Sequence, residues 1–398
     1  EAAIAFFDRQ HAKGQMSLEE ALKLGLGQEG LNDVAGLSVN GVESDGWIGE
    51  LLERLSQSSK IADVPQPATL QANLRPYQLK GLSWLSFLKQ FELGACLADD
   101  MGLGKTIQLI SLLLAERENT PEKNDNAVLK GKESKTKAKE NKGKTEKVKE
   151  KVGPTLLVCP MSVVGNWSKE LARFAPSLRL MVHHGNQRLS GPLFEEAVAG
   201  ADVVLTTYAL LSRDEEELSG IEWERVALDE AQNIKNQSAK QTKAVRRLQT
   251  RYRVALTGTP VENRLSELWS IMHFLNPGYL GTATEFRTRF STPIEKYHDQ
   301  ARSEQLKKLI QPFVLRRLKT DKSIIADLPD KNEMKVWCNL TREQASLYEA
   351  VVKDMVNQIE EAEDSGIQRR GLILATLLKL KQVCNHPAHF MGDRTSSE

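Results

Sequence analysis

Residues 94 to 118 combine residue types that could hold a triphosphate. An apolar run at 95–98 predicts a buried strand, a loop with two glycines follows at 101–104, and Lys105 and Thr106 open a predicted helix. The glycines would let backbone N–H groups approach phosphates, and the helix N-terminus adds its positive end. Lys105 would reach the outer phosphates and the Thr106 hydroxyl would hold Mg²⁺. The alternative is a glycine turn before an ordinary core helix.

Asp229 and Glu230 form a second candidate pair, directly after the apolar run 226–228. An Asp at a strand tip beside a phosphate loop can hold Mg²⁺, directly or through water. The neighbouring Glu can orient or deprotonate the attacking water. An acidic loop at a strand end is the simpler interpretation of the pair alone, but its combination with the glycine loop favours catalysis.

A parallel α/β sheet would bring these residues together. Short apolar runs that alternate with helical stretches predict further strands at 155–159, 178–182, 203–205, 226–228 and 254–256. In such sheets the sites lie beyond the carboxyl ends of the strands. Those ends are polar here, including 206–207 and 257–259, so we expect a site along that edge.

The totals set broad limits. A chain of 398 residues allows two or three domains, and 54 Lys and Arg against 53 Asp and Glu point to no particular partner. Three of the four separated cysteines lie in apolar or strand-like contexts, which predicts small buried residues in a reducing compartment. His183 and His184 lack partners at metal-ligand spacing. No apolar run could span a bilayer and no signal peptide is visible, so we expect no membrane association and a cytoplasmic location.

Two regions differ from the rest. Residues 1–70 predict a helical accessory region with capped helices at 17–24 and 46–55. Residues 121–152 carry eleven Lys against six acids and almost no large apolar side chains, a composition that predicts disorder. This segment could hold nucleic acid through its phosphates, or it could be a solvated insertion without a role.

The remaining segments are predicted to be mostly helical. Residues 74–78 are typical of a helix start with Pro near its first position, and on sequence alone we favour this over a purine-reading Gln78. Long helices are expected at 341–361, beginning at a Thr341 cap, and at 372–383. Basic clusters, such as Arg316-Arg317-Lys319, could be solvated helix faces.

Several motifs together resemble the first half of the Swi/Snf-type ATPase motor of helicase superfamily two. They occur in the family order and cover residues 71 to 390: Leu-Arg-Pro-Tyr-Gln-Leu-Lys-Gly (74–81), Asp-Asp-Met-Gly-Leu-Gly-Lys-Thr (99–106), Leu-Val-Cys-Pro (157–160) with Asn166-Trp167, Thr-Thr-Tyr (206–208), Asp-Glu-Ala-Gln (229–232), Leu-Thr-Gly-Thr-Pro (256–260), Val-Leu-Arg-Arg-Leu-Lys-Thr-Asp (314–321) and Val-Cys-Asn-His-Pro (383–387). Two positions depart from expected patterns. The generic phosphate loop has Gly where Asp99 stands, and the family loop usually has Glu where Asp100 stands. The compact motor is more similar to the bacterial branch, which would make it nucleoid-associated.

The resemblance implies an α/β fold: a RecA-like parallel sheet with helices on both faces, a helical N-terminal accessory region and a helical C-terminal extension. The regions would be 1–70, a first ATP-binding lobe at 71–277, and a helical protrusion and linker at 278–398. The implied site places Gln78 on adenine, and Asp229 and Glu230 on metal and water. Thr257 and Thr259 would link the nucleotide to the DNA surface. The cofactors would be ATP and Mg²⁺, contacted by Met101, Gly102, Leu103, Gly104, Lys105 and Thr106.

The implied function is DNA-stimulated ATP hydrolysis that drives translocation on double-stranded DNA. The partner would be a second RecA-like lobe of the same full-length protein, because the chain stops where that lobe would begin. This chain alone is therefore expected to bind ATP–Mg²⁺ and to turn it over very poorly. The alternatives are a nucleic-acid-binding scaffold that binds nucleotide without turnover, and an RNA-directed helicase.

Overall fold

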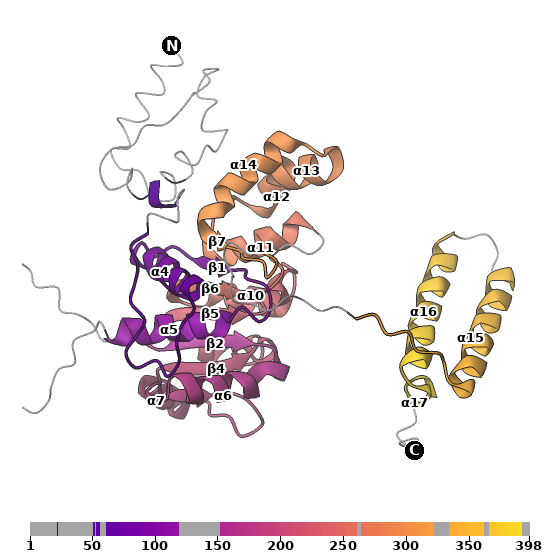
Figure 1. Cartoon of the computed structure of the whole chain (residues 1–398), viewed down its shortest axis with the longest axis horizontal. Coiled ribbons are helices and arrows are strands. Elements are labelled where there is room, and N and C mark those ends of the chain that lie inside the picture. Colours follow the sequence, from indigo (N-terminus) through magenta and orange to yellow (C-terminus); the bar gives the residue numbers. More distant parts are fainter. Residues whose placement is uncertain are drawn as a thin grey trace, which may run out of the picture. The chain divides into compact units, whose positions relative to one another are not determined.

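The computed structural model describes residues 61–118, 152–260, 264–321, 334–361 and 366–391, together with Leu22, Leu51 and 53–55 (Figure 1). The chain divides into two compact units, Glu1–Leu328 and Pro329–Glu398. The helices predicted at 17–24 and 46–55 and the Lys-rich segment 121–152 lie almost entirely outside the described residues.

The first unit is built on a seven-stranded sheet in which every pairing is parallel, with strand order β3-β4-β2-β5-β6-β1-β7. The labels β7, β1, β6, β5, β2 and β4 follow this order across the sheet in Figure 1. All predicted strands are confirmed, with longer or shorter bounds, and β7 is the strand that the sequence did not predict. The bounds are β1 Ala95–Leu97, β2 Thr155–Cys159, β3 Leu180–Val182, β4 Val203–Thr207, β5 Trp223–Asp229, β6 Thr250–Leu256 and β7 Val314–Leu315.

The strand register brings the polar ends together. Leu256 at the end of β6 pairs with Leu97 of β1 on one side and with Asp229 of β5 on the other. The three strand tips therefore lie at one level, and the glycine loop, the threonines after β6 and the acidic pair leave the sheet at the same edge.

Helices cover the sheet on both faces. The residues of β1, β2 and β4 are all buried, as expected for parallel strands with helices on either side. The apolar residues of these helices and of the strands form one core. The elements are α4 Pro76–Gln90, α5 Lys105–Glu118, η2 Met161–Val163, α6 Val164–Phe174, α7 Pro192–Gly200, α8 Tyr208–Leu211, α9 Glu215–Ser219, η3 Ala231–Ile234, α10 Lys240–Arg247 and α11 Leu265–Leu275.

A helical group follows α11 and returns to the sheet as β7. It comprises α12 Ala283–Phe286, the π-helix η4 Arg287–Ser291, α13 Thr292–Tyr297, α14 Gln300–Ile310 and η5 Gln311–Phe313. Its buried residues Phe286, Phe290, Leu309 and Phe313 belong to the same core as the sheet. The helices up to residue 313 therefore pack with the sheet, and the three-region division made at residue 277 stays a prediction.

The second unit contains α15 Arg342–Glu361, α16 Gly366–Asn385 and α17 Pro387–Met391. Both predicted long helices are confirmed. The Thr341 cap is also confirmed, because Gln344 N donates to Thr341 Oγ1 while the Gln344 side chain accepts from Thr341 N. Gln344 Nε2 donates to the carbonyls of Val383 and Cys384, which joins α15 to α16.

Two of the four cysteines are buried and two are exposed, so the prediction of three buried cysteines is correct for two of them. Cys96 and Cys159 are buried, and burial raises the pKa of each thiol to about 12. Cys338 and Cys384 are exposed. All four are free thiols. In the parts of the chain that the structure describes, no helix is both long and apolar enough to cross a membrane.

Candidate nucleotide site

The loop between β1 and α5 has two residues with left-handed backbone angles, and both are glycines. Gly102 and Gly104 have φ of 82° and 78°, in the left-handed region that favours glycine. A Cβ at Gly104 would collide with the Gln78 amide, and one at Gly102 would lie 3.0 Å from Lys319 Nζ. The loop therefore needs glycine for its conformation and for the close approach of its neighbours.

Lys105, the first residue of α5, turns back over the loop. Its Nζ donates to the carbonyl oxygens of Asp99 at 2.7 Å and Asp100 at 3.5 Å. Burial lowers the pKa of Lys105, and the carboxylates of Glu230, Asp99, Asp229 and Asp100 act in the opposite direction. The structure thus brings Lys105 within the electrostatic reach of the acidic pair on β5. Thr106, the next residue of α5, is half-buried.

Asp229 is fixed by two donors. Trp167 Nε1 of α6 donates to Asp229 Oδ2 at 2.7 Å, and Glu230 N donates to Asp229 Oδ1 at 3.0 Å. Burial raises the pKa of Asp229, the Trp167 hydrogen bond lowers it, and the Glu230 charge raises it. Trp167 stands in a family motif, but no local pattern connects it with Asp229.

Glu230 adopts a left-handed backbone, with φ of 51°, a conformation that is uncommon outside glycine and often occurs at functional sites. Its Oε2 accepts a 2.8 Å hydrogen bond from Gln232 Nε2. Gln232 Oε1 accepts from Thr257 Oγ1 at 2.8 Å, and Thr257 Oγ1 accepts from Thr259 N at 3.1 Å. A chain of hydrogen bonds therefore runs from Glu230, just after β5, to the threonines after β6.

Gln78 lies at a helix start and also contacts the glycine loop. The helix start is confirmed: α4 begins at Pro76, and Gln78 Oε1 accepts from Arg75 N at 2.9 Å. The same side chain is buried against the glycine loop, where Nε2 donates to Leu103 O at 3.2 Å. The structure thus places Gln78 beside the loop, and its contact with adenine stays a prediction.

Asp99, the departure from the generic loop, is fully buried. Arg317 Nε donates to Asp99 Oδ1 at 2.8 Å, and Arg317 Nη2 donates to Asp99 Oδ2. Arg317 is 5% exposed, so the interpretation of its basic cluster as a solvated helix face is wrong for this residue. Its neighbours Arg316 and Lys319 are exposed.

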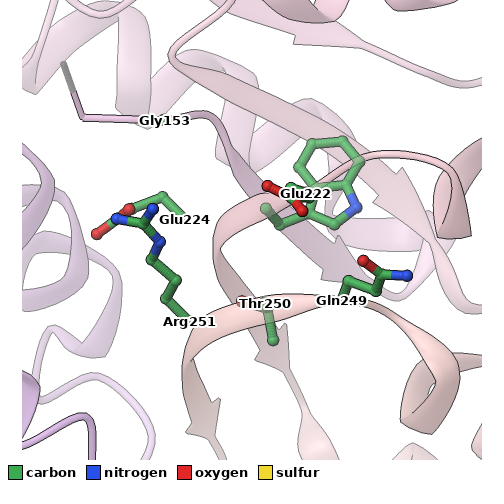
Figure 2. Close-up of a pocket in the computed structure, with 7 residues that line it drawn as sticks. Gly153, Glu222, Glu224, Gln249, Thr250 and Arg251 are labelled. Atoms are coloured by element: carbon green, nitrogen blue, oxygen red, sulfur yellow. The ribbon is translucent and has the colours of Figure 1, made fainter. Parts of the chain in front are cut away.

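An open pocket of about 380 Å³ lies at the opposite edge of the sheet, where β2, β5 and β6 begin. Figure 2 shows Glu224 beside Arg251 on one side, with Glu222 farther along the wall. Two carboxylates disfavour a triphosphate there. The glycine loop at the other edge is therefore the candidate nucleotide site.

These features are those of a RecA-like nucleotide-binding lobe. The SNF2-related domain family matches residues 77–389, and the chain belongs to this family. One relative is the putative ATP-dependent helicase/translocase YwqA of Bacillus subtilis, which is 43% identical over 86% of this chain and 34% of the relative. Another is the chromatin-remodeling ATPase INO80 of Homo sapiens, which is 32% identical over 84% of this chain and 21% of the relative. The higher identity to YwqA supports the similarity to the bacterial branch.

Two solved structures of SWI2/SNF2 ATPase cores are also similar to this chain. The Sulfolobus solfataricus SWI2/SNF2 ATPase core in complex with dsDNA is 45% identical, with a TM-score of 0.56 over 84% of this chain and 63% of that chain. The core domain of the same organism is 46% identical, with a TM-score of 0.56. The chain therefore spans about a third of the length of YwqA and under two thirds of the Sulfolobus core.

Proposed function

We propose that this chain is the nucleotide-binding first lobe of a DNA-stimulated ATPase that translocates on double-stranded DNA. The observation that carries the proposal is the convergence of the glycine loop, Lys105 and the Asp229–Glu230 pair at one edge of the sheet. Family membership supports ATP as the nucleotide. The Sulfolobus core was solved in complex with dsDNA, which supports duplex DNA as the partner.

The loop would hold the phosphates and Gln78 the base. Backbone N–H groups from Met101 to Gly104 and the start of α5 supply donors to anionic oxygens, and Lys105 adds a positive charge. To reach the phosphates, Lys105 exchanges its hydrogen bonds with the carbonyls of Asp99 and Asp100 for phosphate oxygens. Gln78 can donate and accept at once, as recognition of adenine requires.

The site also fits Mg²⁺. Its residues would be Thr106, through its hydroxyl, and Asp229, whose carboxylate keeps lone pairs beyond those used by Trp167 and Glu230. Among the described residues, no group of three or more His, Cys, Asp and Glu side chains could hold a metal. Mg²⁺ does not need one, since it usually takes one or two carboxylates with waters and substrate phosphates. When bound, it would neutralise phosphate charge.

Glu230 would act as the base. Hydrolysis forms a bond from water oxygen to the γ-phosphorus and breaks the bond to the β–γ bridging oxygen, giving ADP and phosphate. Glu230 accepts the proton that water loses. The hydrogen bond from Gln232 fixes one of its carboxylate oxygens and leaves the other to face the water.

A second lobe would supply a group that stabilises the transition state. An arginine that approaches the phosphoryl group from the opposite side is worth roughly 10³ to 10⁵ in rate. The relatives are much longer than this chain, which is consistent with such a lobe. The 398-residue chain alone should therefore bind ATP and turn it over slowly. Turnover by this chain within about tenfold of the DNA-stimulated rate of the full-length protein would contradict the need for a second lobe.

The test is a steady-state ATPase assay of the full-length protein without nucleic acid, with duplex DNA and with RNA. Wild type should be stimulated by duplex DNA. Glu230→Gln should bind ATP and lose at least about 10²-fold in turnover. Glu222→Gln is the matched control, because Glu222 is an exposed glutamate at the opposite edge of the sheet. Stimulation by RNA alone would favour an RNA-directed helicase, and binding without turnover would favour a scaffold.

A further inference from the structure

Arg317 touches three separate parts of the nucleotide site at once. Besides its two hydrogen bonds to Asp99 of the glycine loop, its Nη2 donates to Gln108 Oε1 of α5 at 2.7 Å. Its Nη1 donates to the carbonyl oxygen of Tyr77 at the start of α4, and its guanidinium carbon lies 5.2 Å from the centroid of the Tyr77 ring. One buried side chain therefore joins the loop, α4 and α5.

The partners of Arg317 also hold one another. Gln108 Nε2 donates to Asp99 Oδ2 at 3.3 Å and to Gly104 O at 3.1 Å, so it joins the first part of the loop to its end. Asp99 and Gln108 are both fully buried. A Cβ at Gly81 of α4 would collide with Gln108 Oε1, so the cluster occupies space that a glycine leaves open.

The segment that carries Arg317 follows β7 and runs along the loop. Ala98 N donates to Leu315 O at 2.7 Å, and Asp100 N donates to Arg317 O at 3.0 Å. Lys319 N then donates to Asp100 Oδ2 at 3.0 Å. The segment from β7 to Lys319 thus follows the chain from β1 into the loop, and this alignment places the arginine beside Asp99.

We propose that Arg317 is a positioning residue for ATP, which through Asp99, Gln108 and Tyr77 holds the phosphate side and the base side of the site in one arrangement. The inference rests on the proposed function. The base side is included because Tyr77 precedes Gln78, and the Tyr77 hydroxyl donates to Leu103 O at 3.2 Å. The role requires an arginine, because a lysine has no planar fork of donors with which to bind Asp99, Gln108 and Tyr77 together.

The chain contains a matched control. Arg225 in β5 is fully buried, pairs with Glu116 and lies 5.1 Å from the centroid of the Tyr252 ring. It sits near the start of its strand, toward the edge opposite the glycine loop. Arg225→Lys should therefore disturb a buried ion pair of the same kind without disturbing the nucleotide site.

The experiment compares full-length wild type, Arg317→Lys and Arg225→Lys by the Kd of a fluorescent ATP analogue, by KM and kcat for ATP, and by thermal midpoint. Both variants should lower the midpoint. Arg317→Lys should weaken nucleotide binding between about tenfold and a hundredfold, with a smaller change in kcat, because this is the size expected when one hydrogen bond to a charged ligand is lost. Arg225→Lys should leave Kd within about twofold.

Gln108→Met provides a second variant should Arg317→Lys fail to fold. It keeps the volume of the side chain and removes its hydrogen bonds to Arg317, Asp99 and Gly104. Its Kd should rise in the same direction by a smaller factor. If the Arg317 and Gln108 variants lower the thermal midpoint and keep Kd within twofold, Arg317 is a stability residue and the inference falls while the proposed function stands. Failure of wild type to bind the ATP analogue would instead overturn the proposed function.

Discussion

The indole N–H of Trp167 donates a 2.7 Å hydrogen bond to the carboxylate of Asp229, 62 residues away in the sequence. Burial raises the pKa of Asp229 and this hydrogen bond opposes the shift. The tryptophan therefore favours the ionised form of Asp229 and orients its carboxylate at the tip of β5. In the proposed function, that ionised carboxylate is the form that holds Mg²⁺.

Trp167→Phe should move the acid limb of the ATPase pH profile to higher pH. Loss of the donor removes an interaction that favours the carboxylate, so the pKa of Asp229 rises further and the active form is lost earlier as pH falls. A hydrogen bond to a charged group is worth about 1.5–3 kcal/mol, which corresponds to roughly one to two pH units. The measurement is kcat/KM for ATP between pH 5 and 8.

Trp223→Phe is the control for this substitution. Trp223 is also buried, and its Nε1 donates to Leu218 O at 2.9 Å. It should lower the thermal midpoint as Trp167→Phe does and leave the pH profile in place. Equal profiles for the two variants would show that the Trp167 hydrogen bond does not set the ionisation of Asp229.

Asp202→Asn should destabilise the first unit in a pH-dependent way. Burial alone would raise the pKa of Asp202, but hydrogen bonds and charges from Arg179 and Arg117 outweigh it and lower the pKa to about 2. A carboxyl whose folded pKa lies below its unfolded value stabilises the fold above the unfolded pKa, and this stabilisation is lost as pH falls from about 4 toward 2. The expected loss is about 1–2 kcal/mol at pH 7.

Urea unfolding of wild type and Asp202→Asn between pH 3 and 7 would measure this effect. The difference in the free energy of unfolding should be constant above about pH 5 and should shrink below about pH 4. A difference that stays the same down to pH 3 would contradict a lowered pKa of Asp202. Because Asp202 lies just before β4 begins, away from the glycine loop, the Kd for ATP should not change.

Local patterns were sufficient for most of the sheet. Parallel strands covered on both faces are uninterrupted apolar runs, so Thr155–Cys159 could be located to the residue. The first residues of β5 and β6 were missed, since Glu224, Arg225 and Arg251 interrupt the apolar pattern there. Burial of Arg225 depends on Glu116, which is 109 residues away.

The candidate site was predictable only where its signal is local. Lys105 and the Asp229–Glu230 pair follow apolar strands directly, and the register then places them at one edge. Arg317 could not be found in this way, because β7 has two residues and Asp99 lies 218 positions away in the chain. A buried arginine and a solvated one look the same until the strand pairing is known.

Gly104→Ala should weaken ATP binding. A Cβ at this left-handed position collides with the Gln78 amide and lies 3.1 Å from Ile107 Cγ2, so the loop or the glutamine must move. Gly185→Ala is the control, because Gly185 has a φ of 86° and open space around its Cβ position. Each substitution should cost about 1–2 kcal/mol of stability from the backbone.

Nucleotide affinity separates the two glycine variants. The Kd of a fluorescent ATP analogue should rise by at least about tenfold in Gly104→Ala, as expected when at least one hydrogen bond to a charged ligand is lost, and should stay near the wild-type value in Gly185→Ala. Similar affinities for the two would show that Gly104 contributes backbone conformation without contributing to the nucleotide site.

Thr257→Val should uncouple DNA from ATP hydrolysis. The fully buried Thr257 hydroxyl joins Gln232, and through it Glu230, to the backbone N–H of Thr259 at the exposed end of this chain of hydrogen bonds. Valine keeps the shape and removes the hydroxyl, so Gln232 loses a donor and its orientation toward Glu230 is no longer fixed. Under the proposed function, the ratio of DNA-stimulated to unstimulated turnover should fall several-fold. The Kd for ATP should stay within about twofold, because the glycine loop is untouched. Thr242→Val in α10 is the matched control, since Thr242 is fully buried and its hydroxyl has no hydrogen-bond partner among the described residues. An unchanged stimulation ratio in Thr257→Val, with a lowered thermal midpoint, would mean that these hydrogen bonds only stabilise the edge of the sheet.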